Sequence, residues 1–206
     1  MLTWLQLDMA TSDVEICNMA LTMIGEDFIT ALTDNSPRAR IANLFYNRYR
    51  DAVLGSHFWN GAMKRETLVR LVDTPTFGFA YAFQLPTDYI RLKAVQDNPH
   101  HYRVESGKRI LQDNSTCNIL YVYRVTNPGD LGDLYADALS TKLAAVFAGH
   151  FKQPEMAVEL MREARARLAT ARNVDSSENP AEPITNESWA SSGRLARPQS
   201  RQRTDI

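Results

Sequence analysis

The order of apolar and polar residues near the start of the chain predicts an amphipathic helix. Ser12 followed by Glu15 has the spacing of a capping box, and Gly25 is the residue type that most often follows a helix end. We therefore expect a helix over 13–24. Its cysteine is interpreted as a small buried apolar residue rather than a nucleophile. The residues of its apolar face recur at helical spacing: Val14, Cys17, Leu21 and Ile24.

A second helix is predicted over 37–57. Ser36 is a typical N-cap, and Pro37 suits the first helical position. The stretch 45–65 mixes aromatic and basic residues, as nucleic-acid surfaces do, but at helical spacing such aromatic residues more often belong to the core, which is the interpretation we favour. The stripe expected to face the core is Ile41, Phe45, Arg48 or Tyr49, and Ala52.

The following segment, 66–125, changes to the alternation that is typical of β-strands. It is rich in Val, Ile, Tyr, Phe and Leu and is interrupted by turn residues. Ser106-Gly107, between two short apolar runs, indicates a hairpin turn. Tyr121 and Tyr123 fall on the same face of their strand, so we expect that face to be aromatic. The predicted strands are 66–72, 79–84, 88–96, 101–105, 108–112 and 118–125.

Two further helices are predicted toward the end of the chain. The first, over 131–151, is apolar on most sides, so we expect it to be buried. Pro154 opens the second, over 154–173, where Glu163 and Arg167 form an outer pair in the favourable i, i+4 order. The inner stripe of this last helix is Ala157, Leu160, Met161, Ala164, Leu168 and Ala171.

This order of elements predicts an α+β fold that is mainly α. We expect a four-helix bundle, a small β-sheet or β-sandwich insertion between its second and third helices, and an extended C-terminal tail. The expected divisions are 1–63 for an N-terminal arm and the first two helices, 64–127 for the β insertion, 128–174 for the last two helices, and 175–206 for the tail.

Composition narrows the classes of function. The chain has 23 Lys and Arg against 24 Asp and Glu, and this balance argues against a general nucleic-acid binder. Two cysteines are too few for a disulfide framework, so synthesis in a reducing cytoplasm is expected. No apolar run reaches the roughly 18 residues of a membrane span. The first residues lack the pattern of a signal peptide.

The sequence contains no phosphate-binding loop, HExxH motif or CxxC motif, so we expect no catalytic residue, no metal ion and no cofactor. His100 and His101 are neighbours that would point to opposite faces of a strand, and a solvated loop pair is favoured over metal ligands. His57 is interpreted as a packing residue at a helix end. Two pairs of acidic residues are typical of solvated helix ends rather than of a glycosidase, namely Asp130 with Asp133 and Glu155 with Glu159.

Taken together, several stretches resemble the tail tubular protein A family, the head-to-tail adaptors of T7-like short-tailed bacteriophages. The most specific of them is the pattern Leu85-Pro86-x-Asp88-x-x-Arg91, which is followed by a strand and an Ala-rich helix. One departure is Gly61, where the family pattern leads us to expect an aromatic residue. The matching stretches are 20–34, 38–60, 82–95, 119–148 and 171–180.

The resemblance implies a structural protein of the virion neck, made in the host cytoplasm. It implies a homo-oligomeric ring, a dodecamer, between the portal protein and the tail nozzle protein, through which genome DNA passes without sequence-specific binding. The tail would reach the portal, and its low apolar content fits a segment that orders only on docking. Trp189 is then the candidate anchor, with packing against the protein's own helices as the alternative. The basic residues that would pair with acidic groups of the portal are Arg194, Arg197, Arg201 and Arg203.

Two other classes of function stay open. A cell-wall or polysaccharide hydrolase associated with the tail would be recognised by one carboxylate whose loss abolishes turnover without changing assembly. A nucleic-acid-binding module would be recognised by an affinity for DNA that falls steeply with salt concentration.

Overall fold

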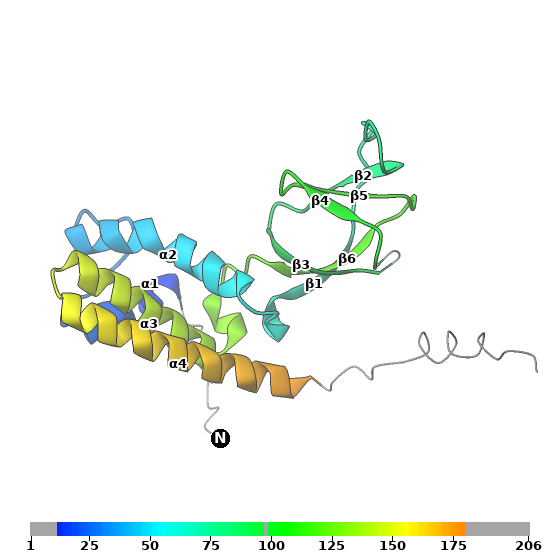
Figure 1. The fold of residues 1–206 in the computed structure, drawn as a ribbon. Helices are drawn as coiled ribbons and strands as arrows, with labels where there is room; N and C mark the ends of the chain where they lie inside the picture. Colours follow the sequence, from blue (N-terminus) through cyan, green and yellow to red (C-terminus); the bar gives the residue numbers. More distant parts are fainter. Residues whose placement is uncertain (1–11, 97–98, 180–206) are drawn as a thin grey trace, which may run out of the picture.

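The computed structural model describes residues 12–96 and 99–179 and has an α+β fold (Figure 1). The described residues form four α-helices and two antiparallel three-stranded sheets. The four helices pack together as one body, which we call the helical layer. The sheets form a separate body, which we call the β unit (63–123), beside the C-terminal end of the second helix.

The first two helices begin at the residues predicted. Helix α1 (Asp13–Met23) starts after Ser12, whose Oγ accepts the N–H of Glu15 at 3.1 Å, and Gly25 follows its end with a φ of 73°. Helix α2 (Pro37–Gly55) starts after Ser36, which caps it in the same way. These predictions succeed because each cap satisfies a backbone donor that the helix itself leaves unpaired.

The side of α2 that faces the core differs from the prediction. Ile41, Phe45 and Tyr49 are only partly buried, whereas Arg48 and Ala52 are exposed. The observed stripe is displaced by one residue, a rotation of about 100° around the helix axis. The reason is that α2 contacts the third helix and also the β unit, so two neighbours determine its orientation. Its buried residues are Ala39, Ala42, Tyr46, Arg50, Val53 and Leu54.

Helix α3 (Asp133–His150) is the centre of the helical layer and contacts each of the other three helices. It is buried, as predicted, and Leu139, Leu143 and Phe147 are completely enclosed. Burial of each such side chain contributes about 1.5–3 kcal/mol to folding. The core of the protein therefore lies around this helix.

Helix α4 (Pro154–Glu178) lies along α3 and buries the predicted inner stripe, with Leu160, Ala164 and Ala171 most deeply enclosed. It continues five residues beyond its predicted end at 173. Residues 175–178 therefore belong to this helix and not to an extended tail, because side-chain contacts described below hold its last turn.

The β unit consists of two sheets that share a hydrophobic core. One sheet has the order β1 (Met63–Thr67), β6 (Asn118–Tyr123), β3 (Tyr89–Val95), and the other has the order β2 (Tyr81–Gln84), β5 (Arg109–Gln112), β4 (Arg103–Glu105). The shared core is formed by Leu68, Phe83, Leu85, Val95, Ile110, Cys117, Ile119 and Tyr121.

Two local features of the β unit agree with the sequence. Ser106 and Gly107 both have positive φ values and form the turn between β4 and β5. The aromatic face of β6 points into the shared core, where Tyr121 is fully buried and stacks on Tyr89 at 6.0 Å between ring centroids. Tyr123 lies partly buried on the same face.

The bounds of the first strand differ from the prediction. The strand is predicted over 66–72, but β1 runs from Met63 to Thr67. After Leu68 the chain leaves β1 and passes to the other sheet, where Leu71 donates its N–H to Ala82 and the N–H of Gln84 bonds to Val69. The predicted strand 66–72 is therefore divided between two sheets. The alternation of apolar and polar residues does not show where the chain changes from one sheet to the other.

Candidate interaction surfaces

Arg91 of the Leu85-Pro86-x-Asp88-x-x-Arg91 pattern joins the β unit to α2. Its Nη1 donates to the backbone carbonyl of Gly55 at 3.1 Å, at the end of the helix, where a cation is favoured by the helix dipole. Its guanidinium also lies 4.3 Å from the centroid of the Phe58 ring. Arg91 therefore ties the end of α2 to β3.

Asp88 of the same pattern belongs to a polar cluster at the side of the β unit. Its carboxylate accepts the Tyr121 hydroxyl at 3.0 Å and pairs with Lys64 at 3.2 Å, and Tyr121 also lies within 2.9 Å of Glu66. Burial, and then the hydrogen bond to Glu66, raises the pKa of Tyr121. Hydrogen bonds to Tyr121 and Asp88 raise the pKa of Lys64. At neutral pH the phenol is neutral and the lysine is charged, so the phenol can donate to a carboxylate and the lysine can pair with Asp88 and Glu66.

A second junction connects α2 with the end of β6. Asp51 accepts from Arg50 at 2.9 Å with one carboxylate oxygen and from Arg124 at 2.9 Å with the other. Arg50 is only 8% exposed, and its charge is balanced by this carboxylate. Together with Arg91, these contacts fix the β unit on the helical layer at two separate points.

The last turn of α4 is held by Asp175. One oxygen of its carboxylate accepts the backbone N–H of Asn60 at 2.9 Å, and the other lies 2.9 Å from Nε2 of His57. The Asn60 side chain donates in return to the backbone carbonyl of Asp175 at 2.6 Å. His57 packs edge-on against Trp59, as expected for a packing residue, and also has this acidic partner. No spacing in the sequence indicated the contact, because its members are more than 100 residues apart.

Gly61 lies in the short helix η1 (Asn60–Ala62), against η2 (Pro128–Leu131). A Cβ atom at this position would stand 2.7 Å from the carbonyl oxygen of Asp130 and 3.3 Å from a methyl group of Leu131. A glycine at this position therefore has a local reason, because the Cβ of any other residue would meet the backbone of Asp130.

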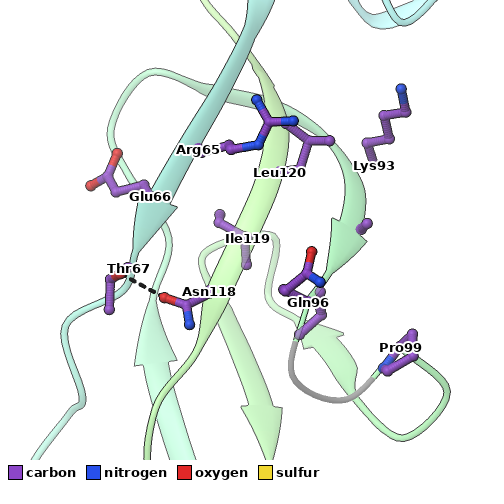
Figure 2. Close-up of a pocket in the computed structure, with 11 residues that line it drawn as sticks. Arg65, Glu66, Thr67, Lys93, Gln96, Pro99, Asn118, Ile119 and Leu120 are labelled. Carbon is purple, nitrogen blue, oxygen red and sulfur yellow. Dashed lines mark hydrogen bonds between the residues drawn. The ribbon is translucent and has the colours of Figure 1, made fainter. Parts of the chain in front are cut away.

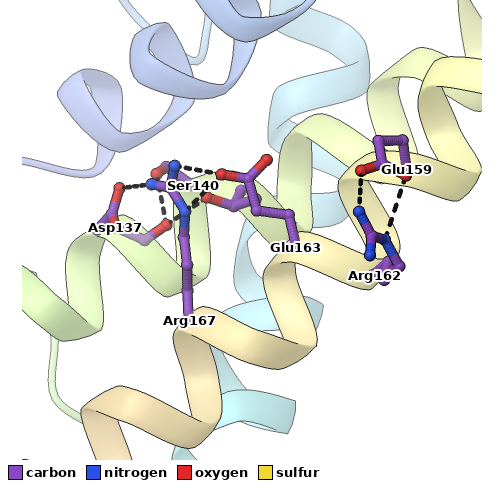
Figure 3. A network of polar contacts seen from close by, with 7 residues as sticks. Asp137, Ser140, Glu159, Arg162, Glu163 and Arg167 are labelled. Carbon is purple, nitrogen blue, oxygen red and sulfur yellow. Dashed lines mark hydrogen bonds and ion pairs between the residues drawn. The ribbon is translucent and has the colours of Figure 1, made fainter.

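An ionic network joins α3 to α4 (Figure 3). Arg167 pairs with Glu163 one turn away on its own helix and with Asp137 on α3. The predicted Glu163–Arg167 pair is present on α4. It does not belong to an outer face alone, because Arg167 also pairs with Asp137 on α3. Arg162 and Glu159 form a separate pair that is exposed. Exposed pairs of this kind contribute little to stability. Arg167, which connects the two helices, is therefore the more important residue of the network for stability.

The outer face of the β1–β6–β3 sheet carries a groove of about 750 Å³ (Figure 2). Arg65 of β1 and Lys93 of β3 lie on either side of Leu120, and the side chain of Thr67 bonds to that of Asn118. The remaining lining residues are Glu66, Ala94, Val95, Gln96, Pro99 and Ile119.

Large apolar side chains are exposed on both the β unit and the helices. They are Phe28, Leu44, Val69, Val72, Phe77, Val104, Leu134, Met156, Val158 and Val174. Val72 is 97% exposed and Phe77 is 87% exposed in the loop between β1 and β2, which projects beyond the β unit. At the far end of the helical layer, Phe28 is 70% exposed in the connection from α1 to α2. Val72 and Phe77 share one loop, and exposed apolar groups that gather in this way are typical of contacts with other proteins.

The remaining residues considered from the sequence are found apart from one another. His101 pairs with Asp113 and its ring lies 5.0 Å from that of Phe79 in a tilted arrangement, whereas His100 is exposed. Asp130 accepts the Asn127 side chain at the start of η2. Within 12–96 and 99–179, no group of three His, Cys, Asp or Glu side chains is arranged to hold a metal ion. Cys17 is buried, as predicted, and burial raises its pKa to about 12.

The residues predicted to bind the portal lie outside the described residues: Trp189, Arg194, Arg197, Arg201 and Arg203. In the part of the chain that is described, no helix has both the length and the apolar character needed to cross a membrane. Neither a protein-family model nor a curated protein matches this chain.

Proposed function

We propose that this chain is a structural head-to-tail adaptor of a short-tailed bacteriophage. It forms a homo-oligomeric ring, a dodecamer, between the portal protein and the tail nozzle protein, and genome DNA passes through the ring during ejection. In this proposal the four helices act as one bundle in the ring wall. The β unit meets the nozzle or neighbouring subunits, and the tail reaches toward the portal. No catalytic residue or cofactor takes part.

The observation that carries the proposal is the role of the Leu85-Pro86-x-Asp88-x-x-Arg91 pattern. Leu85 lies in the β-unit core, Asp88 holds β1 and β6 together, and Arg91 fastens β3 to the end of α2. Two residues of the resemblance thus organise the β unit, and the third attaches it to the helices. A protein that joins other proteins needs such attachment between its parts, whereas an enzyme motif would gather its groups around a substrate.

The exposed apolar groups support the same proposal. They are spread over the β unit and the helices, on surfaces that a partner or a neighbouring subunit would cover in a ring. A near-neutral overall charge also suits a channel through which a polyanion must slide, because strong phosphate contacts would hold the DNA.

A truncation tests the role of the tail. The variant that ends at Asn179 retains Asp175 and its contacts with Asn60, so we expect it to fold with an unchanged circular dichroism spectrum. We expect it to lose binding to purified portal rings, as seen in electron micrographs and by co-sedimentation. The control variant lacks only 204–206 and keeps all four tail arginines, so it should bind fully. Normal docking of the shorter variant would refute the proposed role of the tail.

A further inference from the structure

The described residues of the groove on the outer face of the β1–β6–β3 sheet include two basic side chains with no carboxylate partner among the described residues. Arg65 and Lys93 are exposed, and among the described residues neither has an ionic partner. Lys93 lies 5.7 Å from the ring of Phe58. Glu66, although next to Arg65, turns away in Figure 2 and bonds to Tyr121 on the other face. The groove therefore favours an acidic ligand.

The end of α4 lies close to this groove. The side chain of Asn179 donates to the side chain of Asn60, and Asn60 precedes β1 by three residues. At the rise of a strand, about 3.3 Å per residue, Arg65 lies at most about 17 Å along the chain from Asn60. The next ten residues, 180–189, span up to about 33 Å when extended. This segment is long enough to enter the groove of its own subunit.

The composition of 180–189 matches the groove. It contains Glu182 and Glu187 and no basic residue, whereas 194–206 is rich in arginine. Pro180 and Pro183 restrict the backbone to extended conformations, so less entropy is lost on docking. A nucleic acid fits the groove less well, because no aromatic side chain lines it for base stacking.

We propose that 180–189 docks in the groove of its own subunit, with Glu182 and Glu187 beside Arg65 and Lys93. This contact directs the chain from the end of α4 across the β unit and leaves 194–206 available for another protein. The inference stands without the proposed function, because it depends only on the groove, the place where α4 ends and the charge of the segment.

Cross-linking of engineered cysteines tests the docking. Thr67→Cys combined with Ile184→Cys places one thiol in the groove and one in the segment, and both native cysteines are buried. We expect a disulfide within one subunit, formed about tenfold faster than in the control pair of Asn43→Cys, on the exposed face of α2, with Ile184→Cys. The product should migrate as a monomer on a non-reducing gel. A disulfide-linked dimer, or equal rates in both pairs, would overturn the proposal.

Charge reversal provides the second measurement. Adding Arg65→Glu and Lys93→Glu should slow cross-linking by about three- to tenfold, the effect of losing two partly exposed ion pairs. Adding Glu182→Lys and Glu187→Lys as well should restore the rate. Arg103→Glu, an exposed arginine on β4, should have no effect. If the reversed groove does not slow cross-linking, the acidic segment is not the occupant. The same follows if cross-linking slows only when a single-stranded oligonucleotide is added.

Discussion

Gly61 matters for stability because the short helices η1 and η2 pack closely at its α-carbon. The distance of 2.7 Å from an added Cβ to the Asp130 carbonyl is too short for any real contact, and the obstacle is backbone rather than a flexible side chain. A side chain here must push η1 and η2 apart. That movement also affects Trp59 and Asn60, which lie next to it and contact α3 and α4.

We expect Gly61→Ala to lower the free energy of unfolding by about 1–3 kcal/mol, the usual effect of overfilling a packed site. Chemical denaturation with urea measures the change. The matched control is Gly149→Ala on α3, where an added Cβ meets nothing within 4 Å and where alanine favours the helix. Equal stability of the two variants would show that η1 and η2 can separate without cost.

At the scale of elements, the attachment of the β unit to the helices depends on a few polar contacts. Arg91 reaches the last turn of α2, and Arg124 reaches Asp51 in the same helix. Arg91 lies in β3 and Arg124 directly follows β6, so the β unit has two points of attachment and resists rotation about either one. The apolar residues Val122 and Val125 add to the helical core from the same side.

We expect Arg91→Ala to weaken this attachment by about 1 kcal/mol, through loss of the carbonyl hydrogen bond and of the contact with Phe58. Hydrogen exchange should become faster in β3 and in the last turn of α2 and remain unchanged in α3. Arg103→Ala is the control, because this arginine is also on an exposed strand but makes no contact with α2. Uniformly faster exchange throughout the protein would instead indicate general destabilisation.

For the whole molecule, the distribution of exposed apolar residues determines how copies assemble. Among the described residues, the exposed apolar side chains are spread over α2, α3, α4, β4 and the loops rather than gathered on one element. A stable interface usually buries more than about 1,000 Å² with good complementarity, so we infer weak association between free subunits and tight association when a portal ring arranges them.

The isolated protein is therefore expected to be a monomer or to associate only weakly. Light scattering of the purified protein should give a mass near that of one chain, 23.3 kDa. Addition of portal rings should produce a ring of the adaptor that is visible by electron microscopy. Stable rings of the protein alone would contradict this order of assembly.

Much of the local structure was predictable because its causes are local. The caps of Ser12 and Ser36 and the turn at Ser106-Gly107 depend on atoms within a few residues, so the sequence indicates them directly. The buried character of α3 was also clear, since a helix that is apolar on most sides must be enclosed by others.

What the chain's own residues determined, then, is which segments become helices, strands and turns, because these choices are made by nearby hydrogen bonds and by periodicity. Only the tertiary structure determined which side of α2 faces the core, the passage of 68–71 to a second sheet and the hydrogen bond from Asn60 to Asp175. These features join residues that are distant along the chain. Their energies arise from packing and from burial of polar partners, which exist only when the separate elements have come together.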